Sequence, residues 1–149
     1  MAELAKGGSA PPRQRTERML RFTAVVFAVA VIVHGADHLR RGINASPEAV
    51  RGAGGLQFVA GAIAVVLVFR GDRSAGLWAA YVGFISAAGF AAAHLAPHWS
   101  ALSDPYTGSA VAPHVTGLSW FTALFEIAAD FAFGIAGLRA HRERVQVSS

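Results

Sequence analysis

The chain has 149 residues, of which 54% are hydrophobic and only 15% are charged, well below the roughly 25% charged residues of an average soluble domain. This composition is typical of a membrane protein, and the length predicts one domain. The absence of cysteine excludes disulfides, thiolate metal ligands, iron–sulfur clusters and cysteine nucleophiles. The net charge of +4 does not indicate a nucleic-acid partner, because the basic residues cluster at the ends of apolar blocks.

The chain begins with a polar lead and ends with a polar tail. Residues 1–18 combine glycine, serine, proline and charge, which predicts a disordered cytoplasmic lead. The tail covers residues 141–149. Between the lead and the tail lie four apolar blocks, at about 20–39, 53–69, 75–96 and 118–138. Crossing a hydrocarbon core of about 30 Å takes about 20 helical residues, and no block has the alternation of a barrel strand. The sequence therefore predicts an all-α fold, a four-transmembrane-helix bundle over residues 19–140.

Basic residues predict how the bundle is oriented in the cell membrane. Of the 13 lysines and arginines, ten lie on the side that carries both termini and the connection between the second and third spans. The other side has three, namely Arg40, Arg41 and Arg51. Because cytoplasmic flanks are enriched in basic residues, we expect both termini to be cytoplasmic. Aromatic residues suited to membrane interfaces flank the predicted spans: Trp78, Tyr81, Trp99, Tyr106 and Trp120.

Under this topology, five of the six histidines lie at or near the extracytoplasmic face: His34, His38, His94, His98 and His114. His34 and His38 are four residues apart, which places them on one face of the first helix, and Asp37 lies between them. His94 and His98 repeat this spacing, although Pro97 biases the preceding residue away from helix. The histidines of two spans are therefore predicted at the same depth.

The fourth span carries two acids inside the predicted membrane region. Glu126 lies about 12 Å below the extracytoplasmic boundary and Asp130 near the midplane, at 1.5 Å per residue. A central acid costs about 2.5–3.5 kcal/mol in a membrane helix, so both should face the bundle interior rather than lipid. Together with the histidines, they predict a polar cavity near the extracytoplasmic face.

These residues indicate a site for a transition metal or haem. Imidazole binds zinc, copper and iron, and carboxylates complete a ligand set or orient a ligating ring. We predict His34, His38 and His94 as ligands, with Asp37 and Glu126 as ligands or their hydrogen-bond partners. The further candidates are His98 and His114 as ligands and Asp130 as a proton-handling residue. The bound group is a Zn, Cu or Fe ion, or haem b held axially by two histidines from different helices, for example His34 and His94.

Other interpretations stay open. Asp37 could simply pair with Arg40 or Arg41 while the histidines sit at the level of the lipid head groups, and the buried acids could link helices by hydrogen bonds. The chain would then be a non-catalytic subunit or scaffold of a larger membrane complex. A small proton-coupled transporter is a third alternative, with Asp130 and Glu126 in the proton path. The expected partners are the lipid bilayer and either further copies of the chain or a membrane complex. Because no GxSxG, GxxxxGK[ST] or GxGxxG motif occurs, no enzyme class is predicted.

Overall fold

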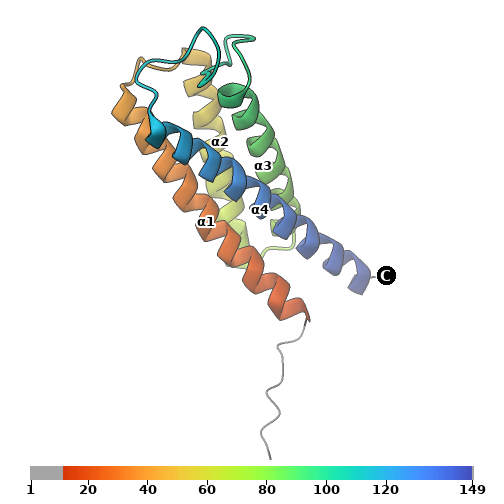
Figure 1. Ribbon diagram of the computed structural model, residues 1–149. Coiled ribbons are helices and arrows are strands. Elements are labelled where there is room, and N and C mark those ends of the chain that lie inside the picture. Colours follow the sequence, from red (N-terminus) through yellow and green to blue (C-terminus); the bar gives the residue numbers. More distant parts are fainter. Residues whose placement is uncertain (1–11, 149) are drawn as a thin grey trace, which may run out of the picture.

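The computed structural model describes residues 12–148, and all regular secondary structure in this range is helical (Figure 1). The elements are α1 (Pro12–Arg41), α2 (Glu48–Arg70), α3 (Ala75–Phe90), the short π-helix η1 (Ala91–Leu95) and α4 (Gly117–Ser148). With η1 continuing α3, they form four helices that are long and apolar enough to cross a membrane. The prediction of an all-α bundle with four membrane-spanning helices is confirmed, while the side on which the termini lie stays a prediction.

The first and last helices are longer than predicted. Residues 12–18 were expected in a disordered lead, but they form the first turns of α1, and α4 continues through His141 to Ser148. A hydrogen bond of 2.7 Å from the Thr16 hydroxyl to Glu143 Oε1 joins these two extensions. The prediction of disorder rested on the glycine, serine, proline and charge of residues 1–18, and this contact between distant segments leaves no local signal in the sequence. The rest of the predicted lead lies outside the described residues.

The two ends of the bundle differ in their connections. The start of α1, the end of α4 and the tight turn between α2 and α3 lie at one end, while residues 42–47 and 96–116 lie at the other (Figure 1). We call the latter the loop end. The tight turn follows from its sequence: Gly71 takes a left-handed conformation (φ 68°) that ends α2, and Asp72 Oδ1 accepts hydrogen bonds from the amide and hydroxyl of Ser74.

Helices α3 and α4 pack with their backbones in close contact through glycine. A Cβ on Gly83 would lie 2.5 Å from the carbonyl oxygen of Asp130, and a Cβ on Gly137 would lie 2.6 Å from the backbone nitrogen of Ala80. No larger residue fits at either position unless the helices separate. Such small residues are typical of helix contacts in membranes, where close packing replaces the hydrophobic effect.

Helix α2 joins the bundle only at the end opposite the loops. Its buried residues are Gly61, Ala64 and Val68, which pack near the stacked rings of Phe27 and Phe133 in the core. By contrast, no residue from Glu48 to Ala60 is buried. The loop-end half of α2 therefore stands apart from the other helices, and a cavity of about 1000 Å³ lies beside it.

Candidate metal centre

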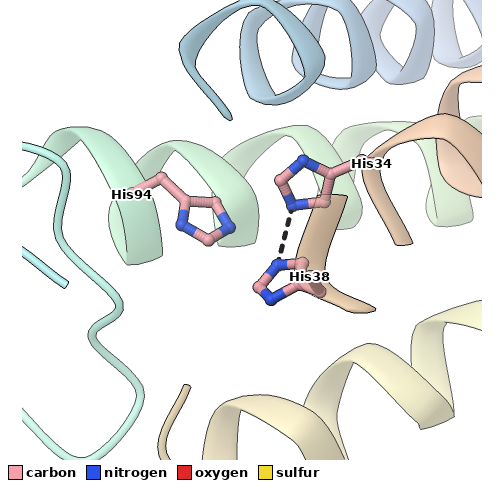
Figure 2. A group of neighbouring side chains, drawn as sticks. All are labelled: His34, His38 and His94. Atoms are coloured by element: carbon pink, nitrogen blue, oxygen red, sulfur yellow. Dashed lines mark hydrogen bonds between the residues drawn. The ribbon is translucent and has the colours of Figure 1, made fainter. Parts of the chain in front are cut away.

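Three histidines converge inside the loop end of the bundle (Figure 2). His34 and His38 come from α1 and His94 comes from η1, and one ring nitrogen of each lies within 4.8 Å of the others. His34 and His94 are fully buried, with 2% and 0% of their surface exposed, and His38 is half-buried. We call these three residues the histidine triad. Its members are the three histidines predicted as metal ligands.

Two local features of the backbone bring the triad together. The spacing of four residues puts His34 and His38 on the same face of α1, as predicted. His94 lies in a π-turn that was not predicted, and the helix then ends at Ala96, whose extended backbone (ψ 151°) precedes Pro97 as expected. The loop stabilises this turn, because the amides of Asp104 and Tyr106 donate to the carbonyl oxygens of Ala93 and His94 at 3.0 and 2.9 Å.

Each imidazole of the triad has an oxygen partner at its Nδ1 atom. His94 Nδ1 lies 3.0 Å from the backbone carbonyl oxygen of Asp104. His38 Nδ1 lies 2.9 Å from the Ser46 hydroxyl, and His34 Nδ1 lies 3.3 Å from the Thr122 hydroxyl. Partners of this kind fix the orientation and tautomer of metal-binding histidines in proteins.

These partners place the ring hydrogen of His94 and of His38 on Nδ1. A carbonyl oxygen can only accept, so His94 Nδ1 must be the donor. The Ser46 hydroxyl donates its single hydrogen to Asp104 Oδ2 at 2.9 Å, and the Thr122 hydroxyl donates to the Ser119 carbonyl at 3.1 Å. The Ser46 hydroxyl is therefore left to accept from His38 Nδ1, whereas the Thr122 hydroxyl can donate either to the Ser119 carbonyl or to His34 Nδ1. Since a neutral imidazole carries one ring hydrogen, Nε2 of His38 and Nε2 of His94 have a lone pair, and His34 Nε2 can donate to His38 Nε2.

The triad contains one hydrogen bond and one unsatisfied nitrogen. Nε2 of His34 and Nε2 of His38 are 3.0 Å apart and share a hydrogen bond (Figure 2). His94 Nε2 is buried and has no hydrogen-bond partner among the described residues. A buried acceptor without a partner costs about 1–3 kcal/mol. A metal ion bound by all three rings would give His94 Nε2 a partner and would replace the hydrogen bond between His34 and His38.

A buried ion pair supports the triad from the loop side. Arg41 and Asp104 are joined by two hydrogen bonds of 2.8 Å, and both side chains are 0% exposed. Burial alone would raise the pKa of Asp104, but the hydrogen bonds and charge of Arg41 outweigh it and hold this pKa below its usual value of 3.8. Sequence reasoning missed both Asp104 and Ser46, because each reaches the site from a connection with no periodic pattern.

The structure leaves the other candidate ligands outside the triad. Asp37 Oδ1 accepts a hydrogen bond of 2.7 Å from Arg40 Nε, which is the ion pair that the alternative interpretation predicted. His98 and His114 are exposed in the loop. Glu126 Oε2 lies 3.9 Å from His34 Nδ1, near the triad but beyond hydrogen-bonding distance.

The two acids of α4 are buried, as predicted. Glu126 is 1% exposed and Asp130 is 0% exposed. None of their four carboxyl oxygens has a hydrogen-bond partner among the described residues. Glu126 also lines the cavity beside the triad, whereas Asp130 lies one helical turn farther from it along α4.

Comparison with protein-family models, with curated proteins and with solved structures finds no match to this chain.

Proposed function

We propose that the chain is an integral membrane protein that binds one transition-metal ion through Nε2 of His34, His38 and His94. The observation that carries this proposal is the convergence of three histidine rings inside the loop end, with one ring nitrogen of each within 4.8 Å of the others. Each ring has an oxygen partner at Nδ1, and the buried His94 Nε2 has no hydrogen-bond partner among the described residues. This arrangement suits three ligands of one ion.

The ligand set favours zinc, copper or iron. All three ligands are neutral nitrogens, and the chain has no cysteine to provide a thiolate. Three protein ligands with an open fourth position are typical of zinc sites that bind a further molecule, whereas structural zinc sites use four. Such an ion would act as a Lewis acid on whatever occupies the fourth position.

A single ion fits the triad better than haem b does. Axial ligands of haem lie on opposite sides of the macrocycle, so their nitrogens are separated by two metal–nitrogen bonds of about 2 Å each. His34 and His38 Nε2 are 3.0 Å apart, and the rings of His34 and His94 have centroids only 5.0 Å apart. These distances leave no room for a macrocycle between the rings.

Metal titration tests the proposal. The protein is purified without chelator and without a histidine tag, and its affinity for Zn²⁺ is measured by competition with a chromophoric chelator. We expect one equivalent of zinc per chain, and a loss of affinity of at least about 100-fold in His34→Ala and His94→Ala. His98→Ala and His114→Ala are matched controls that should bind as the wild type does. Absence of stoichiometric metal, or equal losses in the controls, would overturn the proposal and favour the non-catalytic subunit.

We further propose that the loop end faces the extracytoplasmic side, which the bias of ten basic residues against three supports. Because the chain has no cysteine, single cysteines can report the orientation without a background. Ser109→Cys lies in the loop end and Arg73→Cys in the opposite turn, and both positions are exposed. A membrane-impermeant maleimide added to intact cells should label Ser109→Cys only. Labelling of Arg73→Cys alone would indicate the opposite orientation.

Proton handling by Glu126 and Asp130 is a second candidate function. Its support is that two neighbouring acids are buried in a membrane helix without hydrogen-bond partners. In proteoliposomes with a pH-sensitive dye inside, this function predicts a proton flux that Asp130→Asn abolishes. A flux equal to that of empty liposomes would contradict it.

A further inference from the structure

The cavity beside the triad is lined by both apolar side chains and the candidate metal ligands. Its volume is about 1000 Å³, at the upper end of ligand pockets in proteins, and it lies between α1, α2 and α3. Most of its wall is apolar, from residues that include Val31, Leu56, Phe58, Tyr81, Ile85 and Phe90. The triad and Glu126 line the same cavity. The space is thus apolar along the helices and polar where the metal ligands are.

This cavity is open on the surface that would face lipid. Leu56 and Ile85 line it and are also 73% and 69% exposed, so they belong to the outer surface of the spans as well. The opening exists because the loop-end half of α2 buries no residue against its neighbours. A molecule dissolved in the bilayer could therefore enter from the side.

Charge favours an anionic group at the polar end. A metal dication held by three neutral imidazoles needs compensation in an apolar medium. Among the nearby acids, Asp104 is paired with Arg41 and Asp37 with Arg40. Glu126 has no hydrogen-bond partner among the described residues and, if ionised, balances only one of the two positive charges. Gln57 also lines this cavity, and its amide nitrogen is buried without a hydrogen-bond partner among the described residues. An unused hydrogen-bond donor in a wall residue suits an oxygen anion.

We propose that the cavity binds one fatty-acid-like amphiphile, with its apolar chain along α2 and α3 and its carboxylate as the fourth ligand of the metal ion. This inference rests on the proposed metal site and adds the class of ligand that reaches it. Burial of the chain against apolar walls supplies most of the affinity, and the metal and Gln57 select the head group.

Cobalt(II)-loaded protein in phosphatidylcholine nanodiscs tests this inference, because the visible spectrum of Co²⁺ changes when a ligand enters its coordination shell. We expect dodecanoate to change the spectrum at a concentration at least about 100-fold below that required for acetate. Two adjacent glycines of α2 give a matched pair: Gly54 lines the cavity and Gly55 does not, and neither has an atom within 4 Å of an added Cβ. Gly54→Leu should weaken dodecanoate binding at least tenfold, and Gly55→Leu should leave it unchanged.

The two proposals fail in different ways. If cobalt does not bind, or binds without dependence on His34 and His94, the metal site is refuted. If cobalt binds through the triad but dodecanoate and acetate act at similar concentrations, or Gly54→Leu equals Gly55→Leu, only the lipid ligand is refuted. The nanodisc partitioning of dodecanoate is the same for both variants, so it cannot create a difference between them.

Discussion

Replacing Asp104 with asparagine should lower the free energy of unfolding by about 3–5 kcal/mol, because it leaves the Arg41 guanidinium buried without a counter-charge. The side chains of both residues are 0% exposed, and two bonds of 2.8 Å join them. An exposed pair serves as control: Arg13 and Glu17 are 66% and 43% exposed, so Glu17→Gln should cost about 0–1 kcal/mol.

The double variant Arg41→Met/Asp104→Leu separates this reasoning from simple loss of contacts. Removing both charges leaves no uncompensated ion, so the double variant should be more stable than Asp104→Asn alone. Unfolding is followed by circular dichroism in mixed micelles of dodecyl maltoside and increasing dodecyl sulfate, on metal-free protein. The reasoning about a buried charge is refuted if Asp104→Asn lowers the free energy of unfolding no more than Glu17→Gln does. It is also refuted if the loss in the double variant equals the sum of the losses in Arg41→Met and Asp104→Leu measured separately.

Three further predictions follow from particular contacts. Ser46→Ala removes the oxygen that orients His38 and should weaken zinc binding by about 10–100-fold in a chelator competition. In the same unfolding assay, Gly83→Ala should destabilise the protein by about 1–3 kcal/mol, because the added methyl group pushes against the facing backbone of α4. Its control, Gly89→Ala, has open space at the added Cβ and should stabilise the protein by about 0.5–1 kcal/mol. Because the folded-state pKa of Asp104 is below 3.8, its stabilisation is complete above that pH and is lost on acidification. Metal-free wild type should therefore lose more stability between pH 6 and pH 3 than the double variant does, and equal losses would contradict this.

Much of the fold could be predicted because membrane spans obey simple rules. A run of about 20 apolar residues predicts a crossing helix, and Pro97 predicts the end of the third one. The pairing of His34 with His38 followed from the helical period alone, and the similar depth of His94 followed from counting residues along its span. These inferences need only local sequence.

The remaining parts of the site depend on contacts between distant segments. The π-turn at His94 leaves no periodic signal, and it is held by amides of a loop about ten residues later. Asp104 meets Arg41 across 63 positions and Ser46 across 58. No local pattern marks Asp104 as different from any other acid in a loop. Asp37, predicted as a ligand or partner of the metal, lies outside the triad and has one carboxylate oxygen bonded to Arg40.

X-ray absorption at the zinc K-edge measures the ligands of the ion directly. Zinc-loaded wild type should give three imidazole nitrogens at about 2.0–2.1 Å and one lighter ligand. His94→Ala should lose one imidazole from this shell, while His98→Ala should give the wild-type spectrum. A shell without imidazole, or one that His94→Ala leaves unchanged, would contradict a metal ion held by His34, His38 and His94.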